Sequence, residues 1–391
     1  PLFFLMIRRP PRSTLFPYTT LFRSKHRKMK GRKRRMNGLQ KEIESRHLPE
    51  LMRLENGDAV TNYEDWKLRR EEIKKLLCHE YMGVTPENIK SAFECVGVDE
   101  DAYGGKATEK TIKVQLANNN DAYEFIFKLI LPKVVKEKIP AFLHLQFNEL
   151  VAGGLGEEII DNGYAIVHVC YQDIDPDDSK ESFLGVSRFE KDWINKDRWG
   201  KIAVWAFGAS KIMDYLQTVV QLDHARIAVI GHSRLALTAL WCAAMDERFS
   251  LAVAGNSGSL YRGSQAESFR DLSREYTRYW FCQNLFRDDR DANDLPFDMH
   301  FLIALIAPRY VCLTGATRDL WADAHSEVLS GLAASPAFEI LGQKGLICPD
   351  EILPDTLYDE GNISFFLRSG THFLGRDDWH AVMKYREEKN I

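Results

Sequence analysis

The segment "RIAVIGHSRLALTAL", residues 226–240, contains the pattern that decides the fold. Residues 227–230 are a run of apolar β-formers that ends at Gly231, and the apolar residues after Ser233 recur at helical spacing. This order predicts a strand, a sharp turn and a helix that present Ser233 as a nucleophile. The usual motif, G-x-S-x-G, closes on glycine, whereas the fifth position here is Leu235.

Strands and helices alternate on both sides of this segment. Two period-2 stretches, 110–117 and 123–132, are separated by the polar turn "NNNDA" and predict an antiparallel hairpin. The further predicted strands are 139–147, 163–177, 251–255, 309–315 and 362–369, and the predicted helices are 63–83, 199–220, 324–333 and one that begins at Asp377. An antiparallel start followed by alternating elements predicts the α/β-hydrolase fold, a mixed, mostly parallel sheet with helices on both faces.

Three residues with complementary chemistry follow successive strand ends in this prediction. Ser233, Asp319 and His372 occur in the order serine, acid, histidine that is typical of α/β-hydrolases. The chemistry needs all three, because a neutral serine is a weak nucleophile until an imidazole takes its proton. A carboxylate then orients the ring and stabilises the imidazolium. The spacing therefore predicts a catalytic triad.

Each member also has a purely structural interpretation. Ser233 can be a helix N-cap, His372 an ordinary loop histidine, and Asp319 a cap of the turn that follows it. Asp323 is the alternative acid, because it follows the same predicted strand. The joint placement after three strand ends favours the triad.

The sequence resembles the glucuronoyl esterase family of carbohydrate esterases, as a divergent member of the bacterial type. The resemblance extends from about Leu48 to the end of the chain. The segments that support it are "GHSRL" (231–235), "TALWCAAMDERFSLAV" (238–253), "ALIAPRYVCLTGATRDLWAD" (304–323), "AASPAFEILGQKGL" (333–346) and "RSGTHFL" (368–374). The family reads G-C/H-S-R-x-G-K at the serine, so Leu235 stands at a position where relatives vary.

The resemblance implies a serine carboxylic-ester hydrolase that forms an acyl-enzyme on a carbohydrate-linked or small carboxylic ester, with no cofactor and no metal. Its classical substrates join glucuronic acid on xylan to alcohols in lignin. It also implies that Arg234 contributes to the oxyanion hole, where a guanidinium stabilises developing negative charge. The alternative for Arg234 is an ion pair with a neighbouring loop. Trp321 matches an aromatic that the family places near the sugar, although plain packing explains a tryptophan there equally well.

Three positions depart from the family pattern. Leu237 replaces a lysine that contacts sugar hydroxyls, and Ala236 replaces the elbow glycine. Asn256 stands where many members have the triad glutamate, so the acid is expected to be Asp319 or Asp323. These departures leave the natural ester open. They also support an alternative function, a degenerate α/β-hydrolase-fold protein that binds a carbohydrate or another partner without turnover.

Charge is distributed unevenly over the 391 residues. Residues 1–36 hold twelve of the 52 Lys and Arg and none of the 56 Asp and Glu, so the remainder is strongly acidic. An acidic body argues against a nucleic-acid partner. The run "SKHRKMKGRKRRM" is the one feature that favours such a partner, and a solvated tail explains it better.

The N-terminal segment is set apart from the fold. Residues 1–24 resemble the translation of a sequencing adapter in an assembled metagenomic gene and follow no helix or strand period. We expect residues 1–36 to be an artefactual or disordered basic tail and residues 37–391 to form a single α/β-hydrolase domain. No apolar run is long enough to span a bilayer. The seven cysteines lack metal-ligand spacing and are expected to be free thiols, so we expect a cytoplasmic protein.

Overall fold

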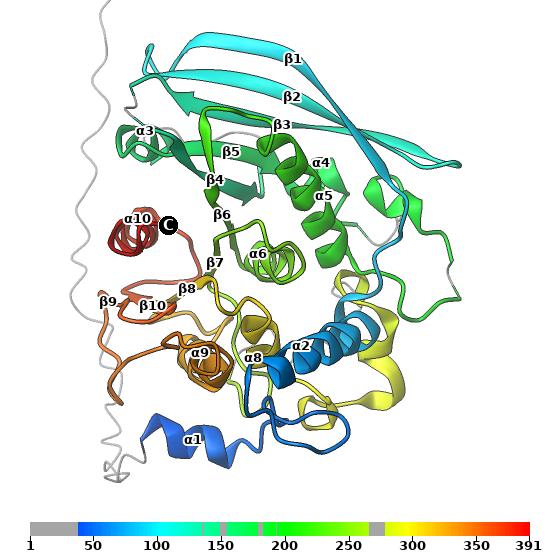
Figure 1. Ribbon diagram of the computed structural model, residues 1–391, viewed down its shortest axis with the longest axis vertical. Helices are drawn as coiled ribbons and strands as arrows, with labels where there is room; N and C mark the ends of the chain where they lie inside the picture. Colours follow the sequence, from blue (N-terminus) through cyan, green and yellow to red (C-terminus); the bar gives the residue numbers. More distant parts are fainter. Residues whose placement is uncertain (1–37, 135–136, 149–154, 179–182, 193, 266–277) are drawn as a thin grey trace, which may run out of the picture. The chain divides into compact units, whose positions relative to one another are not determined.

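A ten-stranded sheet organises the part of the chain that the structure, a computed structural model, describes: residues 38–134, 137–148, 155–178, 183–192, 194–265 and 278–391 (Figure 1). The strand order is β1-β2-β3-β5-β4-β6-β7-β8-β10-β9. The strands are β1 (Lys90–Ala102), β2 (Ala107–Ala117), β3 (Ala122–Pro132), β4 (Ile139–Gln146), β5 (Ala165–Cys170), β6 (Leu222–His232), β7 (Leu251–Gly255), β8 (Tyr310–Ala316), β9 (Thr356–Tyr358) and β10 (Ile363–Arg368). The predicted tail, residues 1–36, lies outside the described residues.

The centre of the sheet is parallel and its two edges are antiparallel. Strands β5, β4, β6, β7, β8 and β10 pair in parallel, whereas β1, β2 and β3 form an antiparallel meander that joins β5. Strand β9 pairs antiparallel with β10 at the other edge. The mixed, mostly parallel sheet predicted from the sequence is confirmed. Because parallel strands end at the same edge, the loops after β6, β8 and β10 meet there.

Strand β6 shows how the two faces of the sheet are covered. Ile227 and Val229 belong to one hydrophobic core cluster, and Ala228 and Ile230 belong to the other, as the period of two requires. The helices are α1 (Leu39–Ser45), α2 (Tyr63–Leu77), α3 (Leu155–Asp161), α4 (Tyr171–Ile174), α5 (Lys201–Leu216), α6 (Arg234–Met245), α8 (Met299–Ala304), α9 (Ala324–Glu339) and α10 (Arg376–Lys389). Helices α3 and α10 supply the second cluster, and α5, α6, α8 and α9 supply the first, on opposite faces (Figure 1).

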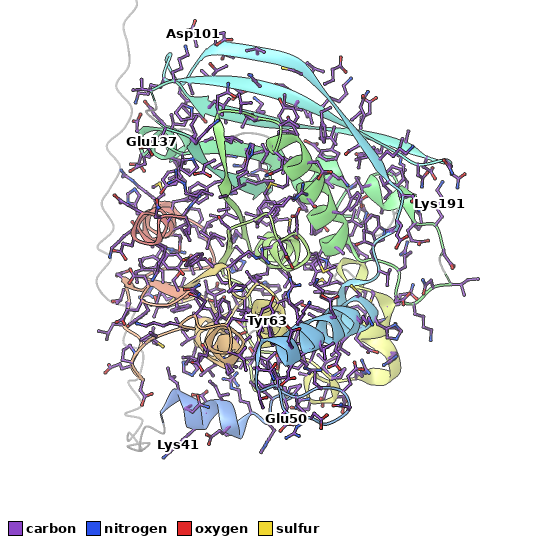
Figure 2. All side chains as sticks on the ribbon, in the orientation of Figure 1. Lys41, Glu50, Tyr63, Asp101, Glu137 and Lys191 are labelled. Carbon is purple, nitrogen blue, oxygen red and sulfur yellow. The ribbon has the colours of Figure 1, made fainter. Side chains whose placement is uncertain are left out.

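Charged side chains lie on the outer surface. Figure 2 shows the side chains on the ribbon, and the labelled Asp101, Glu137 and Lys191 are exposed at its periphery. The seven cysteines, all within the described residues, form no disulfide with one another. Within the described segments, no helix has the length and apolar character needed to cross a membrane.

One strand and several boundaries of helices and strands differ from those expected from the sequence. Strand β1 was not predicted, because its charged residues give it no clean alternation of buried and exposed positions. Helix α9 continues to Glu339, past the predicted end at Ala333, and contains Pro336. A proline inside a helix loses one backbone hydrogen bond, and the burial of Ala337 and Phe338 offsets that cost.

A buried ion pair fixes the segment that follows β5. Lys201, at the start of α5, pairs with Asp175, and both side chains are almost completely buried. Asp175 also accepts a hydrogen bond from the Ser187 amide at 2.7 Å, and its carbonyl accepts one from Trp205 Nε1 at 2.8 Å. These contacts set the position of Asp177, two residues further along, which lines the cavity described below.

We expect Lys201→Met to lower the free energy of unfolding by about 3–5 kcal/mol, because it leaves the buried Asp175 carboxylate unpaired. Lys211→Met, on the same helix, removes a partly exposed pair with Asp214 and is expected to cost less than about 1 kcal/mol. Urea unfolding of both variants measures the difference. Equal losses in the two variants would contradict the conclusion that the buried pair of Lys201 and Asp175 stabilises the fold more than the partly exposed pair does.

Candidate active site

The turn between β6 and α6 places Ser233 in an uncommon backbone conformation. Its φ is 57° and its ψ is −125°, a combination that a non-glycine residue adopts only when its surroundings enforce it. Gly231 allows this turn, because a Cβ at that position would lie 2.1 Å from the carbonyl oxygen of Leu235. The Ser233 amide donates to the Gly255 carbonyl at 2.8 Å, which ties the turn to β7. The glycine that this turn requires is therefore Gly231, two residues before the serine. The fifth position of the motif is occupied by Leu235, which is buried.

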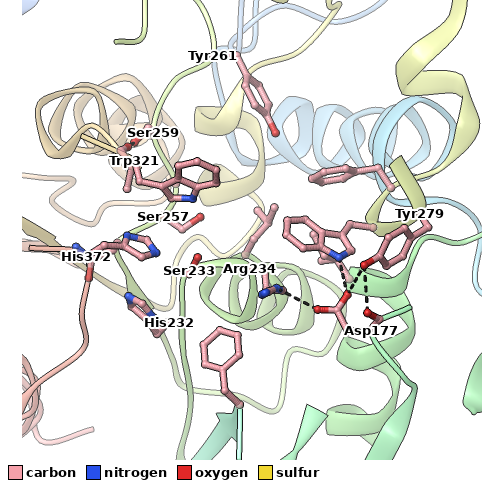
Figure 3. Close-up of a pocket in the computed structure, with 18 residues that line it drawn as sticks. Asp177, His232, Ser233, Arg234, Ser257, Ser259, Tyr261, Tyr279, Trp321 and His372 are labelled. Carbon is pink, nitrogen blue, oxygen red and sulfur yellow. Dashed lines mark hydrogen bonds and ion pairs between the residues drawn. The ribbon is translucent and has the colours of Figure 1, made fainter. Parts of the chain in front are cut away.

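The Ser233 side chain makes no capping hydrogen bond to α6, so the structure gives no support to its interpretation as an N-cap. Instead it lines a cavity of about 700 Å³ together with His232, Arg234, Trp321 and His372. Figure 3 shows the Ser233 hydroxyl between His372 on one side and Arg234 on the other. This volume is in the range of sites for small ligands.

Arg368 holds the loop that bears His372. The loop follows β10, and the Arg368 guanidinium donates to the carbonyls of Thr371 and Phe373, the two neighbours of His372. Arg368 also bonds the Asp378 carboxylate at 2.8 Å. The loop after β8 is tied to the same region, because the Arg318 amide donates to the Gly370 carbonyl at 2.8 Å. These contacts bring the ends of β8 and β10 together.

Asp319 and His372 meet at this junction. His372 Nδ1 lies 2.8 Å from Asp319 Oδ2, and the Asp319 side chain is fully buried. The backbone amides of Trp321 and Ala322 donate to Asp319 Oδ1 at 3.0 and 3.1 Å. Burial acts to raise the pKa of Asp319, but the hydrogen bond and charge of His372 and the two amides outweigh it, so the pKa is lowered. The carboxylate is therefore ionised at neutral pH.

Asn256 is a fourth donor to the same carboxylate. It follows β7, and its Nδ2 lies 2.9 Å from Asp319 Oδ2 in a buried position. The sequence singled out Asn256 only as a missing acid. In the structure the amide stabilises the acid that the next strand supplies.

Asp323, the alternative acid, faces another way. Its carboxylate accepts hydrogen bonds from the Ser326 amide and hydroxyl, the Ser264 hydroxyl and the Gln265 amide. It caps the N-terminus of α9, and burial, the largest influence on its pKa, is outweighed by these hydrogen bonds, which lower the pKa. The geometry favours Asp319 as the partner of His372.

Arg234 lies in an aromatic and acidic cage. Its Nε is 3.3 Å from Asp177 Oδ2, and its guanidinium carbon is 4.7 Å from the ring centroid of Trp280 and 5.0 Å from that of Phe147. The Asp177 carboxylate also accepts hydrogen bonds from the hydroxyl groups of Tyr171 and Tyr279 and from Trp280 Nε1, and Figure 3 shows the last two. No motif in the sequence marks Asp177 or Trp280, because their segments come near Arg234 only in the tertiary structure.

His232 lies beside His372 but stays neutral. Their ring centroids are 4.5 Å apart. Burial, and to a smaller extent the charge of the neighbouring His372, lowers the pKa of His232 to about 4. His232 therefore brings no charge to the cavity near neutral pH. Among the described residues, no group of three or more His, Cys, Asp or Glu side chains is placed to hold a metal ion.

Comparison with known proteins identifies relatives across most of the chain. A family model described as glucuronyl esterase, fungi, matches residues 114–342. A carbohydrate esterase from an unknown prokaryotic organism is 31% identical over 87% of this chain and 89% of its own length. A 4-O-methyl-glucuronoyl methylesterase of Schizophyllum commune is 24% identical over 75% of this chain and 74% of its own length.

Two solved structures have the same architecture. The glucuronoyl esterase from Solibacter usitatus superimposes with a TM-score of 0.80 at 28% identity, over 87% of this chain and 97% of that one. A promiscuous esterase of carbohydrate esterase family 15 from a marine bacterial metagenome superimposes with a TM-score of 0.78 at 30% identity, over 87% of this chain and 96% of that one. The predicted α/β-hydrolase fold is thereby confirmed.

We expect Asp319→Asn to slow covalent labelling of Ser233 by a fluorophosphonate about 10⁴-fold, the loss seen when a triad aspartate becomes an amide. The amide no longer stabilises a positive His372. Asp323→Asn is the matched control, since asparagine also caps helices and accepts a positive φ, and its labelling rate should stay within about twofold. Mass spectrometry of the labelled protein measures both rates. A larger loss in Asp323→Asn would reverse the assignment of the acid.

Proposed function

Because this chain belongs to the glucuronoyl esterase family and is a carboxylic ester hydrolase, we propose that it cleaves a carbohydrate-linked or small carboxylic ester through an acyl-enzyme on Ser233. The hydrogen bond between His372 and the buried Asp319, beside a serine that does not cap its helix, is the observation that supports this proposal best.

In the first half-reaction, Ser233 Oγ attacks the ester carbonyl carbon while His372 Nε2 takes the hydroxyl proton. The Oγ–C bond forms and the carbonyl π electrons move to oxygen. When the tetrahedral intermediate collapses, the bond to the alcohol oxygen breaks, and His372 returns its proton to that oxygen. Water then attacks the acyl-enzyme by the same route, with His372 again as base and then acid, and releases the carboxylic acid and Ser233.

Asp319 keeps the imidazole in the tautomer with hydrogen on Nδ1 and stabilises the cation that forms. Its ionised state and its four N–H donors suit this role, because the carboxylate does not have to reorganise during the reaction. Arg234 supplies positive charge to the oxyanion. The backbone N–H of Arg234, at the first position of α6, has no carbonyl to bond within the helix and adds a second donor.

We expect Ser233→Ala to abolish hydrolysis of 4-nitrophenyl acetate to below about 0.1% of wild type, because the acyl-enzyme cannot form. Ser210→Ala, on α5 and hydrogen-bonded to Asp246, should retain wild-type activity. Release of 4-nitrophenol from purified proteins provides the measurement. Unchanged turnover in Ser233→Ala would refute the proposed mechanism, and wild type with no turnover would favour a binding role.

We expect Arg234→Met to lower kcat about 10²- to 10³-fold with a small change in KM, as for the loss of one oxyanion donor. Arg248→Met removes an exposed arginine that pairs with Asp246 and Asp214, and should leave kcat unchanged. Steady-state kinetics of both variants compare the effects. If KM rises in Arg234→Met while kcat is retained, Arg234 binds the ground state rather than the oxyanion.

A further inference from the structure

The polar side chains on the Arg234 side of the cavity use their hydrogen-bonding atoms internally. The hydroxyl of Tyr279 and the Nε1 of Trp280 donate to Asp177 Oδ1 at 2.9 and 2.7 Å. The hydroxyl of Tyr261 is hydrogen-bonded to that of Tyr81 in the core. A ligand in this part of the cavity therefore meets mainly the carbon surfaces of these aromatic side chains.

Aliphatic and aromatic side chains complete the same wall. Leu237 follows Ser233 by four residues, which places it on the same face of α6, one turn further. It lines the cavity together with Ile202 and Phe281, and all three are largely buried. The one cation on this side, among the described residues that line the cavity, is Arg234, and Asp177 balances its charge.

The direction of proton transfer distinguishes the two halves of the ester. His372 must give its proton to the leaving oxygen, so the alcohol lies on the His372 side of Ser233. The acyl group then extends away from His372. Figure 3 places His372 on one side of Ser233 and Arg234, with Tyr279 beyond it, on the other, whereas Ser257, Trp321 and Tyr261 lie above Ser233 in this view. The acyl group therefore extends along the apolar wall.

The part of the cavity above Ser233 in Figure 3 has a different character. Ser257 and Trp321 line the cavity there, and within the described part of the chain neither side chain has a hydrogen-bond partner. A hydroxyl and an indole N–H are available to a ligand that carries hydroxyl groups. An acyl group with several hydroxyls would instead leave them unpaired against Leu237 and the aromatic carbon surfaces, which is unfavourable in a desolvated site.

We propose that the acyl subsite formed by Leu237, Ile202, Tyr261, Trp280 and Phe281 takes an uncharged apolar acyl group, aromatic or alkyl. This inference rests on the proposed function, because it uses the roles of Ser233 and His372. The substrate class is an ester of an apolar carboxylic acid.

The first test holds the leaving group constant and varies the acid. With 4-nitrophenyl acetate, butyrate and hexanoate, kcat/KM should rise about fourfold for each CH₂ that the subsite buries. Methyl 3-phenylpropanoate should exceed methyl glucuronate in kcat/KM by at least about tenfold. A flat acyl series, or a preference for methyl glucuronate, would overturn the inference.

The second test changes the subsite. Leu237→Lys should reduce the hexanoate-to-acetate ratio of kcat/KM at least about tenfold, because an ammonium then faces the alkyl chain, whereas Leu237→Met, of similar volume, should keep the ratio. Thermal unfolding of both variants establishes that they are folded, and Leu237→Ala replaces Leu237→Lys if the lysine variant does not fold. An unchanged ratio in the folded variant would overturn the inference. If Ser233 is not labelled by a fluorophosphonate and no ester is cleaved, the proposed function fails instead.

Discussion

The close approach of the β6–α6 turn to its own helix is the constraint on which the site depends. Only glycine fits at residue 231, because the carbonyl of Leu235 occupies the space of any Cβ. In this turn Ser233 has a positive φ, and its hydroxyl makes no capping hydrogen bond to α6. Ser233, the proposed nucleophile, and the first N–H of α6 lie at the same edge of the sheet, where the loops after β8 and β10 begin.

Asp319, the proposed catalytic acid, is held by several hydrogen bonds rather than by one strong partner. Asp319 is buried, and a buried carboxylate is costly unless hydrogen bonds satisfy it. Four N–H groups from three segments do so, and one of them belongs to Asn256. An asparagine after β7 is therefore compatible with a carboxylate after β8. The Asn256 amide donates a hydrogen bond to Asp319, whereas a second carboxylate at that position would repel it.

Asp177 determines both the position of Arg234 and the apolar surface of the proposed acyl subsite. Asp177 fixes the guanidinium and, through Tyr279 and Trp280, removes polar atoms from the cavity surface. The Asp177 carboxylate thus orients Arg234, the proposed oxyanion donor, and makes the surroundings of Arg234 apolar. The buried pair of Lys201 and Asp175 holds the segment in which Asp177 lies, so the core of α5 supports the chemistry of the site.

The sequence by itself determined the strand–turn–helix at Ser233, the alternating order of the parallel strands and the candidates for acid and base. These follow from local periodicity and from the order of strand ends, which a single chain displays directly. Only the tertiary structure favours Asp319 over Asp323 as the partner of His372, because both follow β8 and only the loop contacts from β10 distinguish them. It alone revealed Asp177 and the donor role of Asn256, because hydrogen bonds between segments far apart in sequence leave no periodic pattern along the chain.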